Sequence, residues 1–398
     1  MIGLADDGEK QDMIKRGTGN YQMTSDGKPN REYRDYEFNL RELAGSMGDF
    51  GTLFPLAVSY IAINGLDPAG LFVMLGLTNI ALGLIYRLPM PLQPKKIIAV
   101  TAITQQWEPS LIYASGFGLG ILWIILSISG LLKKLVRITP DFLVRGVQLA
   151  LALTLGWQAL QWMRPAPLLG IAAIAIVLAL RQNRYAPASI VLMVVGFAMI
   201  ALEGKMPSTL QPAFTLPSVS LPRLNDIWQA MLLAGFAQIP LSITNAVIAP
   251  AAIIRDYFPK KAVEERKLML NMGVMNAIGS LFSGMPICHG AGGLAGQYYF
   301  GARTGGASIM EGVIELAIGL FLSQSIAEIL THFPMALIAG MMLMVAIQLA
   351  LPMRKLKGME LGLAIGSALI SVITNIGIGF MAGLAVTYAL RLARSIKD

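Results

Sequence analysis

Two short stretches bounded by proline or glycine contain the residue types best suited to binding an anion inside a membrane. The first runs from Pro89 to Pro94 and the second from Gly284 to Gly290. Each interrupts an apolar region and is followed by small residues that can restart a helix. A helix that begins within the membrane presents free backbone N–H groups and a partial positive charge. Two such starts that face each other predict an anion site without a cluster of arginines.

The first stretch offers an amide and a cation. Pro94 suits the first helical position, because the N–H that proline lacks is not needed there. Gln93 precedes it, and Lys96 follows in the first turn, where a cation opposes the helix dipole. An anion facing Lys96 would explain this locally unfavourable placement. The alternative is that Lys95 and Lys96 extend to the membrane interface.

The second stretch offers a histidine and a run of small residues, with His289 followed by Gly290, Ala291 and Gly292. Glycines let backbone N–H groups approach a ligand closely, and His289 can donate to an oxyanion or carry a proton. Cys288 is the only cysteine, so no intrachain disulfide forms. We expect no metal and no cofactor, because two adjacent residues rarely supply two metal ligands. An enzyme built on Cys288 and His289 would need a third oriented polar group.

Two long apolar spans carry polar residues that we expect to line the same site. The first holds Gly48, Asp49 and Thr52. An acid inside a span is costly, so Asp49 is predicted to pair with Lys96, bind a coupling cation or relay a proton. The alternative is a structural hydrogen bond. His289 is the other candidate proton carrier.

The second of these spans, the eighth in the chain, holds Gln238, Ser242 and Asn245. Their spacing of i, i+4 and i+7 places them on one face of an α-helix. Such a polar stripe either lines the site or joins neighbouring helices. Glu311 and Glu315 also lie one turn apart, on the eleventh segment, and the sequence gives them no role.

Composition identifies the class of protein that these residues belong to. The chain is 55% hydrophobic and 14% charged, with a mean hydropathy of +0.63, and a soluble domain carries about 25% charged residues. We therefore predict an all-α polytopic membrane protein. The net charge of +8 is expected from basic cytoplasmic loops and does not indicate nucleic acid binding.

The apolar runs give fourteen segments, of which the third and tenth are half-length. The runs lie at 41–63, 67–86, 94–107, 110–132, 139–163, 166–180, 187–203, 226–252, 267–283, 288–301, 304–326, 333–351, 358–373 and 375–392. An even number places both termini on one side. Most basic residues collect on that side, whereas Arg164, Lys205 and Arg223 lie on the other. Both termini are therefore predicted to be cytoplasmic. Twelve spans would give the same parity.

The two halves of the chain repeat each other at a nearly constant offset. Met90-Pro91 matches Met285-Pro286, and Pro140 matches Pro334. Seven segments in each half would invert the second repeat relative to the first, so that the two half-helices meet near the midplane. The predicted organisation is a disordered cytoplasmic tail over 1–37, a first repeat over 38–206, an external loop over 207–222 and a second repeat over 223–398.

In these residues the chain resembles the molybdate transporter family that is related to the sulfate permease superfamily. The resembling stretches are Glu42–Thr52, Pro89–Lys96, Met285–Tyr298 and Phe300–Gly305. The resemblance implies a seven-plus-seven inverted repeat, with segments 1–4 and 8–11 as a core and the others as a gate. It also implies molybdate uptake, a possible homodimer, and binding roles for Gln93, Lys96 and His289. Lys95 and Tyr299 depart from the family pattern, which has an apolar and a basic residue there.

The sequence thus predicts a transporter, not an enzyme, that takes up molybdate through the cell membrane by alternating access. Tungstate is nearly the same size as molybdate and is expected as a second substrate. Two alternatives stay open. Sulfate is also tetrahedral, so a sulfate transporter is the runner-up. An anion channel is a different class, which a continuous wet pathway and single-channel currents would reveal. The coupling ion, a proton, sodium or none, is left undetermined.

Overall fold

The computed structural model describes residues 22–23, 29–30, 34–132, 140–180, 188–206 and 212–395. It divides into two units, Met1–Asp35 and Tyr36–Asp398. In the first unit, β1 (Gln22–Met23) pairs antiparallel with β2 (Pro29–Asn30). The predicted disordered tail over 1–37 otherwise falls largely outside the described residues. The rest of this section concerns the second unit.

The second unit is a helical protein in which every predicted apolar run contains helix within its described part. The elements before residue 207 are α2 (Leu40–Ser46), η1 (Met47–Asp49), α3 (Phe50–Ala62), α4 (Pro68–Tyr86), β3 (Gln93–Pro94), α5 (Lys96–Thr104), α6 (Pro109–Ser129), α8 (Asp141–Met163), α9 (Pro167–Ala179) and α10 (Ala188–Leu202). The described chain therefore adds short strands to the predicted all-α fold, and one of them lies in the first interruption.

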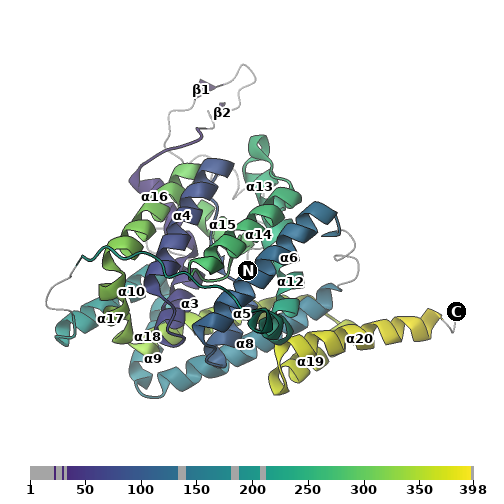
Figure 1. Ribbon diagram of the computed structural model, residues 1–398. Helices are drawn as coiled ribbons and strands as arrows, with labels where there is room; N and C mark the ends of the chain where they lie inside the picture. The colour runs from purple at the N-terminus through teal and green to yellow at the C-terminus, as the bar shows by residue number, and fades with distance from the viewer. Residues whose placement is uncertain are drawn as a thin grey trace. The chain divides into compact units, whose positions relative to one another are not determined.

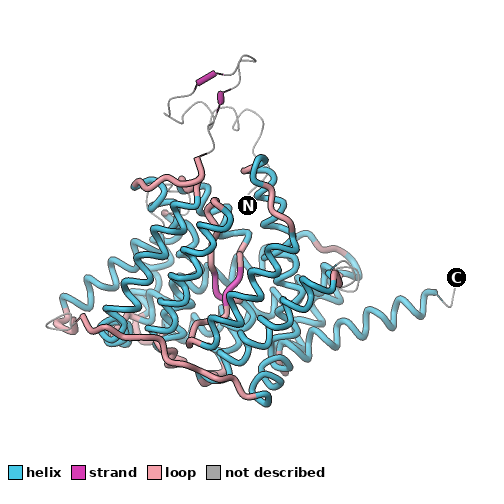
Figure 2. The backbone as a smooth tube through the Cα atoms, turned by 45° about the horizontal axis from the view of Figure 1, so that its top comes forward, coloured by secondary structure: helices cyan, strands magenta, loops and turns pink. Residues whose placement is uncertain are grey.

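A second short strand lies in the other interruption, among the elements that follow residue 222. These are α11 (Leu224–Ala230), η2 (Met231–Gly235), α12 (Phe236–Ser242), η3 (Ile243–Ile248), α13 (Ala249–Tyr257), η4 (Pro259–Lys261), α14 (Glu265–Leu281), β4 (Ile287–Cys288), α15 (Ala291–Phe300), α16 (Gly305–Ala317), η5 (Ile318–Leu322), α17 (Ser323–Thr331), α18 (Met335–Ala350), η6 (Leu351–Lys355), α19 (Gly358–Ile373) and α20 (Ile376–Ser395). Figure 2 shows β3 and β4 as a strand pair enclosed by helices.

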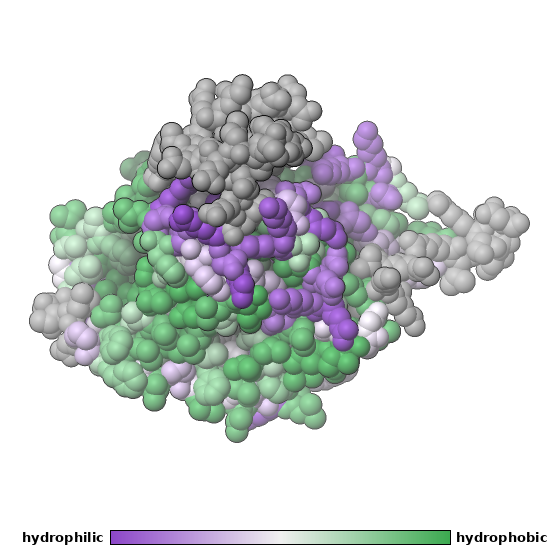
Figure 3. Space-filling model, turned by 90° about the horizontal axis from the view of Figure 1, so that it is seen from above, coloured by the Kyte–Doolittle hydropathy of each residue, from purple (hydrophilic) through white to green (hydrophobic). Residues whose placement is uncertain are grey.

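Six helices of the described chain are long and apolar enough to cross a membrane. They are Pro68–Tyr86, Pro109–Ser129, Asp141–Met163, Leu224–Tyr257, Gly305–Thr331 and Met335–Lys355. Four shorter apolar helices accompany them. On the face seen in Figure 3, hydrophilic residues gather together and hydrophobic residues lie around them. The chain is therefore a polytopic membrane protein, as its composition predicts.

Local sequence signals set several helix ends. The Asp67 side chain accepts from the Ala69 N–H and caps α4, with Pro68 at the first helical position. Proline is favoured there because its fixed φ matches the helix. Gly130, at a φ of 68°, ends α6 in the left-handed conformation that glycine adopts without strain. These ends agree with the predicted runs to within a few residues.

Glycines bring two pairs of helices into backbone contact. Figure 1 shows α4 beside α16 and α6 beside α14. A Cβ at Gly76 would lie 2.6 Å from the Gly312 carbonyl oxygen, and one at Gly120 would lie 2.9 Å from the Gly273 carbonyl oxygen. Small residues at such crossings let membrane helices approach closely. One helix of each pair also contacts an interruption, since Ser308 of α16 bonds Met90 and Asn276 of α14 bonds Ile287.

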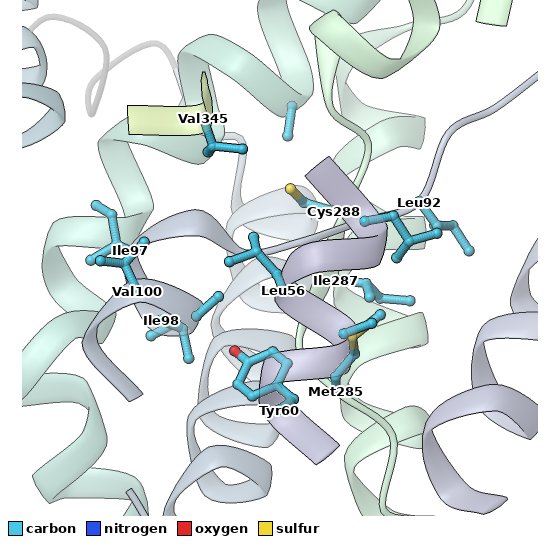
Figure 4. Close-up of a cluster of buried hydrophobic side chains, with 14 of the residues drawn as sticks. Leu56, Tyr60, Leu92, Ile97, Ile98, Val100, Met285, Ile287, Cys288 and Val345 are labelled. Atoms are coloured by element: carbon cyan, nitrogen blue, oxygen red, sulfur yellow. The ribbon is translucent and has the colours of Figure 1, made fainter. Parts of the chain in front are cut away.

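An apolar core holds the short helix α5 and the strand β4 in place. Figure 4 shows Leu56 and Tyr60 of α3 close to side chains of α5, β4 and α18. Ile97 and Ile98 of α5 have no exposed surface, and Ile287 of β4 is 3% exposed. Such close packing leaves the interruptions little freedom to shift.

Candidate functional site

The two interruptions are joined by a short antiparallel ladder. Gln93 pairs with Cys288, and Pro94 pairs with Ile287. The Lys95 N–H also donates to the Pro286 carbonyl oxygen at 2.9 Å. The prediction that Pro94 begins the helix is wrong, because this pairing keeps Pro94 extended and α5 begins at Lys96. The ladder places the starts of α5 and α15 next to each other.

The Asn276 side chain of α14 forms hydrogen bonds to the backbone of β4. Its Nδ2 donates to the Ile287 carbonyl oxygen at 2.8 Å, and its Oδ1 accepts from the Ile287 N–H at 2.9 Å. One side chain thus satisfies both backbone groups of a buried residue in irregular chain. Buried backbone groups need such partners inside a membrane. Asn276 therefore supports the β4 strand of the ladder.

Gln93 lies across the first turn of α15. A Cβ at Gly290 would collide with the Gln93 amide oxygen, and one at Gly293 would lie 2.8 Å from its Nε2. Glycine is required at both positions because the amide occupies the space of a side chain. Lys96 Nζ donates to the same Gln93 oxygen at 3.3 Å. Gln93, Lys96 and Gly290 are thus brought together as the sequence predicts.

Gly292 is the open position in this turn. Apart from its own helix backbone and chain neighbours, no atom of the described residues lies within 4 Å of the place that its Cβ would take. The residue is exposed between buried Ala291 and buried Gly293. The N–H groups of a first helical turn have no acceptor in their own helix. The start of α15 therefore presents backbone donors at a point where a ligand has room to approach.

The polar pair on α12 caps the start of α5. Gln238 Oε1 accepts from the Ile97 N–H at 2.9 Å, and Gln238 Nε2 donates to Ser242 Oγ at 2.9 Å. Each residue is 1% exposed. Asn245 lies in the π-helical η3, where the α-helical spacing that predicts a shared face does not apply. π segments on both sides of α12 are a feature that often marks functional helices.

The first span is broken by η1, which carries Gly48 and Asp49. A Cβ at Gly48 would lie 2.6 Å from the Gln297 backbone nitrogen, so Gly48 serves the contact between η1 and α15. Asp49 is 3% exposed and faces the Gln297 side chain of α15. Thr52 lies buried one turn further along, in α3.

His289 and Lys95 form a second group beside the ladder. Both side chains have no exposed surface, and Lys95 Nζ has no hydrogen-bond partner among the described residues. The His289 ring packs edge-on against Tyr86, with 6.2 Å between centroids. Lys95 Nζ lies 5.9 Å from the centroid of the Trp123 ring. Lys95 therefore does not reach the membrane interface, which corrects that alternative.

The site also contains residues to which the sequence assigned no role. Ser308 Oγ accepts from the Met90 N–H at 3.0 Å and so holds the first interruption to α16. Glu311 and Glu315 on the same helix are 4% and 5% exposed. Their spacing showed that they share a face, but only the packing shows that this face meets α4.

Comparisons with known proteins identify relatives over most of the chain. The family described as "Molybdate transporter of MFS superfamily" matches residues 41–155 and 230–349. The chain is 29% identical over 401 residues to Molybdate transporter 1 of Arabidopsis thaliana, covering 87% of each protein. It is 31% identical over 373 residues to Molybdate transporter 2 of the same plant, covering 80% of each.

Solved structures with a similar fold are anion transporters of distant sequence. The transmembrane domain of a cyanobacterium bicarbonate transporter, BicA, matches with a TM-score of 0.65 at 14% identity, covering 85% of this chain and 96% of that one. Murine Solute Carrier 26 family member A9, in its inward-facing state, matches with a TM-score of 0.66 at 15% identity. That match covers 91% of this chain and 70% of the other. At these identities the match shows the fold alone.

Proposed function

This chain belongs to the molybdate transporter family, and we propose that it takes up molybdate as a secondary active transporter in the cell membrane. The observation that carries this proposal is the pairing of two helix starts through the β3–β4 ladder. Both helices direct the positive ends of their dipoles toward the same region. A doubly charged oxyanion between them would meet backbone donors, an amide and a cation. Since the family is one of transporters, an enzyme using Cys288 is not proposed.

The proposed binding residues fall into a set that touches the anion and a set that supports it. Gln93, Lys96, Gly290, Ala291 and Gly292 would contact the oxyanion, because they meet at the two helix starts. Supporting residues are Gln238 and Ser242, which cap α5, Gly48, which packs η1 on α15, and Thr52 and Asn245 nearby. His289 stays outside the contacting set, because its ring is wholly buried against Tyr86.

Alternating access would follow from an inverted repeat of seven segments in each half. In this repeat α4, the second segment, corresponds to α14, the ninth. Likewise α6, the fourth segment, corresponds to α16, the eleventh. The close contacts within both pairs support that symmetry. The core would contain segments 1–4 and 8–11, and the gate segments 5–7 and 12–14, where α8 packs on α18 and α19. Movement of the core against the gate would open the site to each side in turn.

The remaining organisation is proposed from the distribution of charge. Both termini would be cytoplasmic, with the repeats at 38–206 and 223–398 and the loop at 207–222 outside the cell. Within that loop the described part is tied to the helices, since the Thr215 N–H donates to the Leu320 carbonyl oxygen at 2.8 Å. A homodimer is proposed from the family alone, and the molecular mass in detergent would test it.

Uptake by purified protein in liposomes tests the proposed function. Labelled molybdate should enter with saturation, unlabelled molybdate and tungstate should compete at similar concentrations, and sulfate should compete more weakly. The reason is that molybdate and tungstate have nearly the same size and charge, whereas sulfate is smaller. Liposomes without protein provide the background.

Two results would contradict this function. Sulfate that competes better than molybdate would make the protein a sulfate transporter. Uptake that does not saturate, together with single-channel currents across a planar bilayer, would make it an anion channel.

A further inference from the structure

Three acidic side chains meet inside the membrane-spanning region, next to the proposed anion site. Asp49 lies on η1, and Glu311 and Glu315 lie one turn apart on α16. They are 3%, 4% and 5% exposed. Asp49 and Glu315 both lie close enough to Glu311 for their charges to act on it. Three carboxylates held this close in a dry region cannot all stay ionised without positive charge.

The group is short of hydrogen-bond donors. Asn79 Nδ2 donates to Glu315 Oε2 at 2.7 Å. By contrast, one oxygen of Glu311 and the amide oxygen of Asn79 are buried and have no hydrogen-bond partner among the described residues. Asn79 is itself only 1% exposed, and its bond to Glu315 directs the amide into the group. Because a protonated carboxyl gains a donor, each bound proton would satisfy an acceptor that is now unpaired.

The groups that face this cluster from neighbouring elements supply little compensating charge. They are Asn79 from α4, Gln297 from α15 and Lys96 from α5. Glu42 of α2 accepts instead from the backbone N–H groups of Arg303 and Thr304, just before α16. Lys96 is the cation that acts on Asp49, and it also bonds Gln93. The Lys96 ammonium group, which is shared with Gln93, is therefore the cation that faces these three carboxylates.

The geometry favours protons over a metal ion. Within the described residues, no group of three or more His, Cys, Asp or Glu side chains is arranged to hold a metal. The carboxylates are near enough to influence one another, yet they do not converge on a common centre. Protons need no such convergence, since each occupies a single oxygen.

Asp49 connects the cluster to the anion site. A Cβ at Gly293 would lie 3.1 Å from Asp49 Cβ, so the carboxylate lies beside the open first turn of α15. An ionised Asp49 would repel an oxyanion at Gly292 and attract Lys96. A protonated Asp49 would do neither, which leaves Lys96 available to the oxyanion. Proton binding and oxyanion binding would then favour each other by the same factor.

We propose that Asp49, Glu311, Glu315 and Asn79 form a proton-binding site that couples proton entry to oxyanion uptake. The proposal rests on the proposed function and extends it by naming the coupling ion and the residues that carry it. Protons entering down their gradient load the carboxylates, and the loaded cluster admits the doubly charged anion. Release of both on the inner side resets the site.

The test uses full-length protein in liposomes that contain a pH-sensitive dye, with the membrane potential clamped at zero. In the wild type, an acidic exterior should accelerate molybdate uptake, and added molybdate should acidify the interior. Glutamine at position 311 is neutral at every pH. In Glu311→Gln the acceleration of molybdate uptake by an acidic exterior should therefore fall about tenfold or more, and molybdate should no longer acidify the liposome interior. Glu328→Gln is the matched control, because Glu328 is exposed on α17 and should behave as the wild type.

The outcomes separate this inference from the proposed function. If the wild type takes up no molybdate, the proposed function itself is wrong. If it takes up molybdate without acidification and regardless of the pH gradient, or only with a sodium gradient, the proton site is overturned. These wild-type measurements decide the matter even if Glu311→Gln fails to fold. A wild-type pH profile in Glu311→Gln would also contradict the assignment.

Discussion

Replacing Gly292 with valine is expected to weaken molybdate binding about 100-fold or more while the protein still folds. Gly292 has open space where a side chain would project, so valine would meet no protein atom within 4 Å of its Cβ. It would instead occupy the approach to the first-turn N–H groups of α15. Each hydrogen bond to a charged group contributes about 1.5–3 kcal/mol. Loss of two would weaken binding by about 100-fold or more.

Calorimetric titration of purified protein with molybdate measures this effect, and Gly362→Val is its control. Gly362 also lies in a helix, α19, is exposed and has open space around it. Both substitutions carry the same helix-propensity cost, so their unfolding temperatures should change alike. Gly362→Val should bind molybdate as the wild type does. Normal binding by Gly292→Val would exclude the start of α15 from the site.

Replacing Lys96 with glutamine is expected to weaken molybdate binding by about 10- to 100-fold, the range of one charged hydrogen bond. Lys96 Nζ donates to the Gln93 oxygen that lies across α15, which places its charge at the junction of the two helix starts. The change would also leave Asp49 without the cation that acts on it. Lys96→Arg keeps the charge and should retain most of the affinity.

The neighbouring lysine supplies a sharper control. Lys95→Gln removes the same charge one residue away, but Lys95 contacts Trp123 and has no hydrogen-bond partner. It should therefore weaken binding less than Lys96→Gln. The same titration compares all three variants. A larger loss with Lys95→Gln would assign the anion to the Lys95 and His289 side of the ladder.

Much of this architecture follows from apolar runs and prolines, because both act locally. A run of about 20 apolar residues predicts a span, and a proline pair within one predicts a break. The third and tenth segments were located in this way. Their pairing was not predictable, since a two-residue ladder depends on where two distant stretches meet. That ladder keeps Pro94 extended, which local helix rules would not indicate.

The candidate site was predicted where residue type alone limits the chemistry. Gln93, Lys96 and the glycines of α15 are polar or small at a helix start, and this combination has few other uses. The surroundings of Lys95 could not be predicted, because helix packing decides that this lysine lies over Trp123. The π segment η3 was not predictable either, and it changes the residue spacing that applies to Asn245. Glu311 and Glu315 lacked a role because only the fold brings Glu315 to Asn79.

The most direct test of the central claim locates the molybdenum atom itself. Crystals of the protein grown with molybdate would show its position by anomalous scattering, independently of the protein density. We predict one strong peak between the starts of α5 and α15, within contact of Gly292 and Lys96. A peak beside His289 and Lys95, or one outside the membrane-spanning helices, would contradict the paired-helix account of oxyanion binding.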